Sequence, residues 1–219
     1  GWYPRRSGVS YTQGTRVVDF GEIDGKTDLM ATVLYEGSKG TKISSITFNH
    51  LLTQFSIKVY APDAAAQGLW GTVSSIKIAE KKQTCTITLP AATEAANTAA
   101  APTFTGNSDL DLVNTDLTTS PAATINYPLT LGVGTAANAA QAGYAMFAPQ
   151  TTGNVVLKIE LSSGVTQTVN VPVPTTPAPA GFLHGHAYEI TLKFSSSAIT
   201  PTVAVADWVP VTNTPEVEI

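Results

Sequence analysis

Residues 46–60, ITFNHLLTQFSIKVY, bring together more apolar side chains than any other stretch of comparable length in this chain. At both ends of the stretch apolar and polar residues alternate, which is the period of a strand with one buried face. In the middle the apolar residues have helical spacing, at Phe48, Leu51, Leu52 and Phe55. We therefore predict two core strands joined by one short turn. His50, at the corner, is expected to be structural, so that His50→Ala lowers stability and removes no specific activity.

The length and charge of the chain restrict its class. A chain of 219 residues can form one large or two small domains with a sizeable core. Charged residues make up only 13% of the sequence and the net charge is −4, so neither value favours nucleic acid as a partner. Low charge together with many Thr and Ser residues favours an extracellular β protein over a cytosolic enzyme.

Short alternating segments along the chain predict an all-β sandwich with short helical turns. Strands are expected at 17–20, 29–34, 70–79, 84–89, 125–131, 155–161, 165–171, 186–194 and around 203–205. Two hairpins follow from this pattern, one turning at residues 80–82 and one at residues 162–164. A helical turn is expected at 63–68, a short helix at 136–142 and a loop at 90–102.

The same pattern divides the chain into three parts. Residues 1–26 are predicted to form an N-terminal arm, with an irregular course over residues 1–16. Residues 27–150 form an N-terminal β-sandwich lobe, and residues 151–219 form a C-terminal β lobe. The alternative is one continuous sandwich of both lobes. No apolar run approaches the ~20 residues of a membrane span, and residues 1–6 lack the apolar core of a signal peptide. The chain is therefore either cytosolic, or its export signal was removed before residue 1.

Motifs that resemble metal sites each lack a requirement. Cys85 is the single cysteine, which excludes an internal disulfide, and its face of the strand predicts a buried structural thiol. Asn107, Asp109 and Asp111 have the spacing of a calcium loop without its glycine or its final glutamate, so a polar loop is predicted. His184 and His186 have no third ligand nearby in the sequence.

Motifs that resemble nucleotide or catalytic sites are equally incomplete. Residues 132–137 (GVGTAA) match a dinucleotide fingerprint, but the following helical segment is short and the chain has no further βαβ units. Residues 21–27 (GEIDGKT) have three residues between the glycines where a phosphate loop needs four. Residues 106–110 (GNSDL) lack the closing glycine of a nucleophile elbow. We therefore predict no catalytic residue, no cofactor and no enzymatic activity.

Four segments, in this order and spacing, carry a resemblance to a known family. They are residues 27–31 (TDLMA), the F-x-H-L-L-x-x-F segment at 48–55, residues 146–150 (MFAPQ), and residues 182–190 (FLHGHAYEI) followed by 203–208 (VAVADW). Together they resemble the fimbrillin-like (Mfa-like, type V pilin) proteins of Bacteroidetes. Residues 90–143 carry no such resemblance. The matching positions are Phe48, His50, Leu51, Leu52, Phe55, Tyr188 and Trp208.

The resemblance implies transthyretin-like β-sandwich lobes and a structural or adhesive subunit of cell-surface fimbriae. It also implies export as a lipoprotein to the outer membrane, with the lipid anchor in the precursor. In this family, proteolysis beside an N-terminal arginine opens a groove that a strand of the next subunit fills. The candidates for cleavage are Arg5, Arg6 and Arg16, and the sequence does not choose among them. The candidate donor or edge strand is the C-terminal tail, at Val211, Val217 and Ile219.

Two other functions stay open on the sequence. One is a monomeric surface lipoprotein that binds a glycan or a host protein, with Trp2, Tyr3 or Trp70 as exposed contacts. The other is an enzyme, for which the dinucleotide match would be the starting point.

Overall fold

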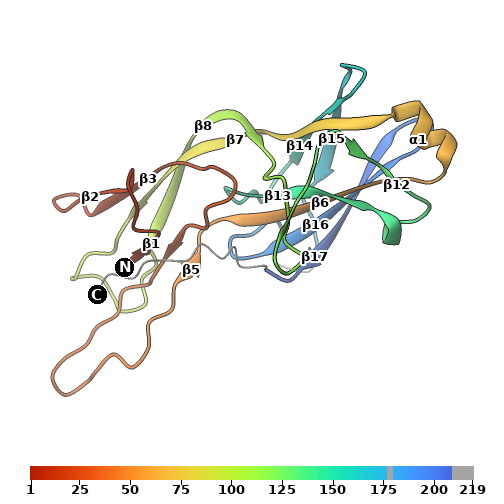
Figure 1. The fold of residues 1–219 in the computed structure, drawn as a ribbon. Helices are drawn as coiled ribbons and strands as arrows, with labels where there is room; N and C mark the ends of the chain where they lie inside the picture. Colours follow the sequence, from red (N-terminus) through yellow and green to blue (C-terminus); the bar gives the residue numbers. More distant parts are fainter. Residues whose placement is uncertain (177–179, 209–219) are drawn as a thin grey trace.

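The computed structural model describes residues 1–176 and 180–208, and most of its regular structure is β-sheet (Figure 1). The first large sheet is built on one long strand, β7 (Thr72–Thr88), which extends from α1 to the end of the molecule that holds β3 (Figure 1). Its strand order is β15–β14–β7–β3–β2. The partners are β14 (Asn154–Leu161), β15 (Thr166–Pro172), β3 (Val17–Glu22) and β2 (Ser10–Thr12). Two further strands pair with β7, namely β8 (Ala101–Asp111) and β11 (Leu129–Thr130).

The second large sheet is built on β6 (Thr53–Ala61). On β6, β16 pairs in parallel, β13 in antiparallel and β12 in parallel orientation, and β17 pairs antiparallel to β16. These strands are β12 (Gly132–Val133), β13 (Ala140–Phe147), β16 (Ala187–Phe194) and β17 (Ile199–Ala206). Each large sheet thus combines strands from both sides of residue 150.

The facing sides of the two large sheets form one hydrophobic core. Alternate residues of β16 are buried, at Tyr188, Ile190, Leu192 and Phe194. The strand β14 buries Val155, Leu157, Ile159 and Leu161 in the same way. These side chains belong to one continuous cluster with those of β6, β7 and β13. The prediction of an all-β sandwich is confirmed, as is the hairpin that turns at residues 162–164.

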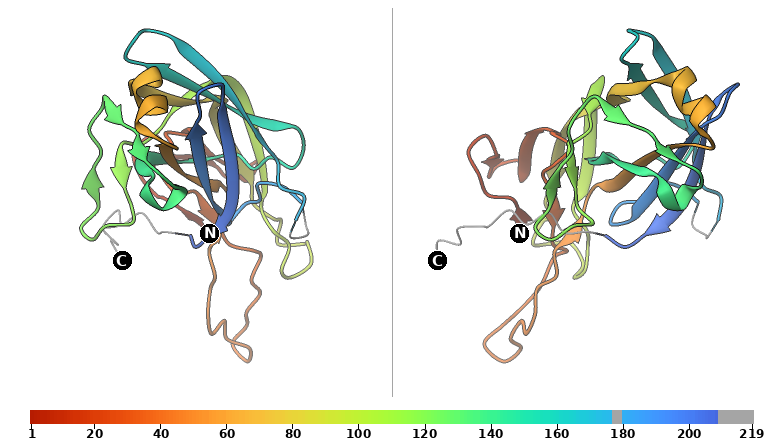
Figure 2. Two further views of the ribbon diagram at one scale, coloured as in Figure 1. Left: turned by 90° about the vertical axis from the view of Figure 1, so that its right-hand side faces the viewer. Right: turned by 45° about the vertical axis from the view of Figure 1, so that its right-hand side comes forward.

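Smaller elements complete the fold. A three-stranded sheet in the order β1–β4–β5 holds the N-terminus, and β9 pairs with β10. Their bounds are β1 (Trp2–Tyr3), β4 (Met30–Ala31), β5 (Asn49–His50), β9 (Thr115–Asp116) and β10 (Ala123–Thr124). The loop between β4 and β5 projects away from the body of the molecule in both views of Figure 2.

The two helical elements of the described residues are short. The helix α1 (Ala64–Trp70) begins after Asp63, whose carboxylate accepts a hydrogen bond from the Ala66 backbone N–H at 2.8 Å. It continues two residues beyond the predicted end and stops at Gly71, which has a φ of 70°. The second element, η1 (Ala136–Asn138), is a single 3-10 turn, because β13 already begins at residue 140.

The predicted hairpin at residues 80–82 is wrong, because β7 runs through it. Glu80 has a φ of 59°, and the pairing with β8 shifts register between Ile78 and Lys82. This irregularity is a bulge, which bends a strand without reversing it. The sequence EKK also lacks the Gly or Asn that a tight hairpin turn favours.

The polar loop predicted at residues 107–111 is also wrong, since these residues lie in β8. Most side chains of β8 are exposed, so its sequence shows no amphipathic alternation. The backbone is nevertheless paired with β7 from Lys77 to Thr88. Backbone pairing of this kind leaves little trace in a sequence.

The N-terminal strand predicted within residues 46–60 is not present. Ile46 is 57% exposed and Phe48 is 42% exposed, so neither lies in the core. The helical spacing from Phe48 to Phe55 does not reflect a helical turn either, because β5 ends at His50 and β6 begins at Thr53. The remaining differences between the predicted and the observed strands concern only a few residues each. Residues 1–16 contain β1 and β2, and the strands predicted at 29–34 and 125–131 shrink to β4 and β11.

Candidate functional site

The N-terminal strand lies at the outer edge of the small sheet with a backbone pairing of two residues, and its Trp2 side chain packs against the core. Trp2 is paired with Ala31 and Tyr3 with Met30. The terminal ammonium of Gly1 donates to the Thr32 hydroxyl at 2.8 Å, and the Thr32 backbone N–H donates to the Gly1 carbonyl at 2.9 Å. Two residue pairs and one terminal clamp therefore attach the first residues to β4.

An open, largely apolar pocket of about 330 Å³ lies beside this strand. Its walls come from the N-terminus, from both ends of the projecting loop and from the two residues that follow β7, at Gly1, Thr32, Val33, Leu34, Tyr35, Ile46, Phe48, Leu89 and Pro90. The exposed Phe48 side chain is therefore part of a surface pocket. An ideal Cβ on Gly1 would lie 3.6 Å from its ring, which shows how closely the N-terminus borders the pocket.

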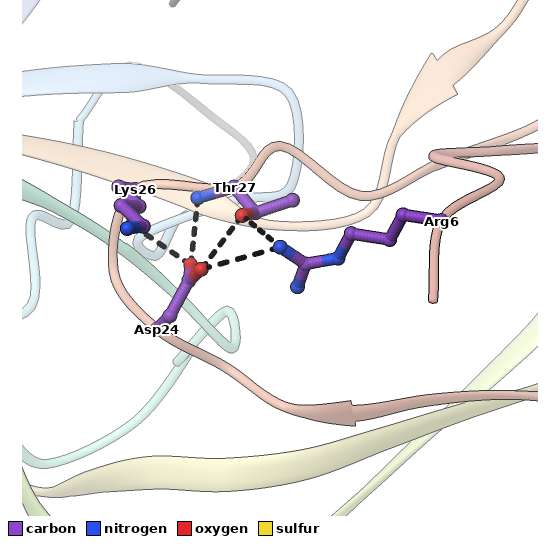
Figure 3. Close-up of polar contacts among 4 residues, drawn as sticks. All are labelled: Arg6, Asp24, Lys26 and Thr27. Carbon is purple, nitrogen blue, oxygen red and sulfur yellow. Dashed lines mark hydrogen bonds and ion pairs between the residues drawn. The ribbon is translucent and has the colours of Figure 1, made fainter. Parts of the chain in front are cut away.

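Arg6, three residues beyond the end of this strand, is bound into a polar network (Figure 3). Its Nη1 donates to the Thr27 hydroxyl at 3.0 Å and lies 3.5 Å from Asp24 Oδ2. Asp24 also accepts hydrogen bonds from the backbone N–H groups of Lys26 and Thr27, at 3.1 and 2.7 Å, and from the Thr27 hydroxyl at 2.7 Å (Figure 3). The GEIDGKT segment thus forms an Asx turn whose aspartate binds the Arg6 side chain. The Asp-x-x-Thr spacing in the sequence indicates such a turn.

The Asp24 network gives a prediction for the pH dependence of stability. Burial raises the pKa of Asp24, but hydrogen bonds from Thr27 and Lys26 and the charge of Arg6 outweigh it and leave the pKa below 3.8. The contribution of ionised Asp24 is therefore present above the unfolded-state value and is lost as the pH falls through the folded-state value. We expect Asp24→Asn to destabilise the protein at neutral pH and to lose this effect in strong acid. Urea unfolding of both proteins at neutral and at strongly acidic pH measures this loss of stability. A loss of equal size at both pH values would contradict the prediction.

The other two candidate arginines have different surroundings. Arg5 is exposed, its guanidinium carbon lies 5.4 Å from the centre of the Trp2 ring, and no carboxylate pairs with it among the described residues. Arg16 is half-buried at a φ of 59°, and its Nε donates to the Leu89 carbonyl at 3.0 Å. Cleavage at any of the three arginines stays a prediction, and so does the choice among them. The geometry favours Arg5, because it makes no hydrogen bond within the described part of the chain.

His50 connects three parts of the molecule. Its Nδ1 lies 2.6 Å from Asp28 Oδ2, and its ring lies 4.2 Å from the ring of Trp208. Asp28 follows the Asx turn, and Trp208 follows β17. These contacts support the structural role predicted for His50, whose partner Asp28 the sequence did not single out.

The other signature positions lie as follows. Leu51, Leu52, Phe55 and Tyr188 are buried, and Trp208 packs against the core while partly exposed. The Tyr188 hydroxyl donates to the Gly181 carbonyl at 2.8 Å and accepts from the Leu183 backbone N–H at 3.1 Å. The donor-strand candidates Val211, Val217 and Ile219 lie outside the described residues.

Cys85 belongs to the hydrophobic core, and Trp70 packs against it. Burial, with a smaller contribution from the charge of Asp19, raises the pKa of Cys85 to about 12, so the buried thiol is a poor nucleophile. Within residues 1–176 and 180–208, no group of His, Cys, Asp or Glu side chains is arranged to hold a metal ion. Trp70 is half-buried: its Nε1 donates to the Ser195 carbonyl at 2.6 Å and its ring packs on Phe194. Over the same residues, no helix has the length and apolar character needed to span a membrane.

Comparison with known proteins shows which folds and which family this chain resembles. Two solved structures share its fold, both proposed cell adhesion proteins. The first, from Bacteroides uniformis ATCC 8492, has 18% sequence identity and a TM-score of 0.57, with 94% of this chain and 71% of that chain covered. The second, from Bacteroides ovatus ATCC 8483, has 19% identity and a TM-score of 0.50, with 95% and 66% covered. No curated protein matches the sequence significantly.

A family profile described as fimbrillin-like matches residues 1–208, which is nearly the whole chain. The chain therefore belongs to the fimbrillin-like family, as the sequence motifs predicted. Membership of this family supports a role in a pilus or in adhesion, at the cell surface and together with other pilin subunits. It also favours a structural over a catalytic role.

Proposed function

We propose that this protein is a structural or adhesive subunit of cell-surface fimbriae that assembles by donor-strand exchange after proteolysis near its N-terminus. Family membership supports the fimbrial part of the proposal. The short backbone pairing of β1 supports the exchange part, and it is the observation on which the proposal depends. Only two residue pairs hold this strand on β4, and Arg5 and Arg6 follow it after Pro4.

Removal of the first residues would change the surface in two ways. The outer backbone edge of β4 would lose its partner, and an unpaired strand edge is a template for another chain. The apolar pocket would also lose the wall that Gly1 contributes and would become continuous with that edge. A strand that adds to β4 could then place an apolar side chain in the pocket, which is the recognition mode of β-strand addition.

The C-terminal tail of a second subunit is the proposed donor. Its sequence, VPVTNTPEVEI from residue 209, alternates Val217 and Ile219 with acidic residues. Such alternation gives one apolar face to a bound strand, so that backbone hydrogen bonds supply affinity and the apolar positions fix the register.

Cleavage with an arginine-specific protease tests the proposal, because the chain contains only three arginines, at positions 5, 6 and 16. We expect a cut after Arg5 or Arg6, located by mass spectrometry, followed by oligomers in size-exclusion chromatography. The double variant Arg5→Gln, Arg6→Gln is expected to stay intact at these positions and monomeric.

A peptide of residues 209–219 provides the second part of the test. It is expected to bind the cleaved protein and to block oligomer formation, whereas a peptide with Val217→Asp and Ile219→Asp is expected to do neither. If the cleaved protein stays monomeric and does not bind the first peptide, the exchange mechanism is wrong.

The same proposal includes location and partners. The subunit would be exported and anchored in the outer membrane through a lipid on its precursor, and a host surface protein or glycan would be the target of adhesion. Fractionation of cells that express the full precursor, with and without globomycin to block lipoprotein processing, would check the anchor.

A further inference from the structure

A second hollow lies between β1 and β2, and it has a different chemistry from the apolar pocket. Its volume is about 390 Å³, near the lower end of the range of about 300–1,000 Å³ for small-molecule sites. One short segment of the chain supplies its whole lining, at Trp2, Arg5, Arg6, Ser7, Val9 and Tyr11.

Arg5 gives this hollow a positive charge, and Arg6 adds a second guanidinium group whose charge is shared with Asp24. Arg5 has no carboxylate partner among residues 1–176 and 180–208, so its charge is available to a ligand. Arg6 shares one nitrogen, Nη1, with Asp24 and Thr27, while its Nε and Nη2 make no hydrogen bond within the same residues. Guanidinium groups match planar anionic groups such as carboxylates, and also sulfates, through paired N–H donors.

Two aromatic rings lie beside these charges. The rings of Trp2 and Tyr11 are 5.2 Å apart with an angle of 31° between their planes. Tyr11 is 44% exposed, so one aromatic surface remains open to a ligand. Aromatic faces carry partial negative charge and attract the slightly positive C–H groups of an apolar surface, such as one face of a pyranose ring.

From this combination we infer that the hollow between β1 and β2 is a binding site for an acidic sugar. A pyranose ring would pack on the Tyr11 side of the aromatic pair, and its negatively charged substituent would pair with Arg5 and Arg6. The Ser7 hydroxyl would bind a ring hydroxyl. A neutral sugar would leave Arg5 without an anion, and an aliphatic anion would leave the aromatic surface uncovered.

The fold fixes this arrangement before a ligand binds. Trp2 is held by its pairing with Ala31, and Tyr11 by its pairing with Val18 on β3. Between them the Val9 backbone N–H donates to the Arg6 carbonyl at 3.1 Å, and the Asp24 network fixes the Arg6 side chain. A site that is ordered in advance loses little conformational entropy on binding. Because Trp2 and Arg5 are part of it, the site exists only in the uncleaved subunit.

Isothermal titration calorimetry on the uncleaved full chain tests the inference with three hexasaccharides. Hexagalacturonate carries carboxylates, a chondroitin sulfate hexasaccharide carries carboxylates and sulfates, and maltohexaose is neutral. We expect one or both acidic sugars to bind and maltohexaose not to bind. Stronger binding of chondroitin sulfate than of hexagalacturonate would identify sulfate as the preferred group, and the reverse order would identify carboxylate.

Matched variants locate the site. Arg5→Gln is expected to weaken binding by about tenfold or more, as the loss of a charge-assisted hydrogen bond implies, and Tyr11→Ser is expected to weaken it as well. Lys39→Gln removes the same charge from the projecting loop and is expected to leave the affinity unchanged. Melting temperatures of all variants show that they fold.

The inference fails if neither acidic sugar binds, if maltohexaose binds equally well, or if Arg5→Gln and Lys39→Gln have the same effect. Because the titration uses uncleaved monomer, its failure would leave the proposed strand exchange untouched, and a failure of oligomer formation would leave the sugar site untouched.

Discussion

Replacing Phe55 with alanine is expected to lower the free energy of unfolding by about 3–5 kcal/mol, the usual cost of deleting a fully buried phenyl ring. Phe55 is completely buried in β6. Its ring meets those of Phe147, Phe182 and Tyr188, with centroids 4.7, 4.6 and 6.3 Å away. The variant would lose its edge-to-face contacts with three neighbours and leave a cavity that these rings cannot close without leaving their own positions.

The matched control is Phe48→Ala, which removes the same ring from the surface pocket. Since Phe48 is 42% exposed, a cost of roughly 1 kcal/mol or less is expected. Urea unfolding followed by tryptophan fluorescence measures both variants. Equal losses in the two variants would mean that Phe48 belongs to the core, as its helical spacing with Phe55 first predicted.

The second large effect is expected at Gly143, where an alanine should cost at least about 2 kcal/mol because backbone strain and overpacking act together. Gly143 has a φ of 133°, a conformation that side chains with a Cβ rarely adopt. A Cβ built there would lie 2.6 Å from the backbone oxygen of Val113. That oxygen accepts a hydrogen bond from the Tyr144 backbone N–H, so it cannot move away without loss of the bond.

Gly40→Ala is the control for this variant. Gly40 lies in the projecting loop, and a Cβ there would meet no atom within 4 Å. The substitution is expected to be neutral or slightly stabilising, because it reduces only the freedom of the unfolded chain. If Gly143→Ala unfolds at the same urea concentration as Gly40→Ala, the close approach of β13 to Val113 is wrong.

The parts of the fold that the sequence predicted well are those with one buried face. In β14, β15 and β16 the apolar side chains alternate, and this alternation records directly which face meets the core. The strand β8 and the continuity of β7 were missed for the opposite reason. Backbone groups make the pairing in every sheet, and the mostly exposed side chains of β8 add no comparable signal to it.

The candidate site was predictable only in part. The three arginines could be named from the sequence, but their differences depend on contacts with residues far along the chain, such as Arg16 with Leu89. The pairing of His50 with Asp28 joins residues 22 positions apart, and no local pattern indicates it. Phe48 was misplaced because helical spacing arose by coincidence across the end of one strand and the start of the next.

The long strand β7 has a mechanical consequence. Its backbone is hydrogen-bonded to four other strands, β14 and β3 along one edge and β8 and β11 along the other. A pulling force directed along β7 would load these bonds in shear, so that many must break together. The hydrogen bonds along β7, from the end of the molecule near α1 to the end near β3, would therefore share the load. They would not break one after another. A subunit with such a long strand, paired along both edges, would resist stretching most strongly along the axis of β7.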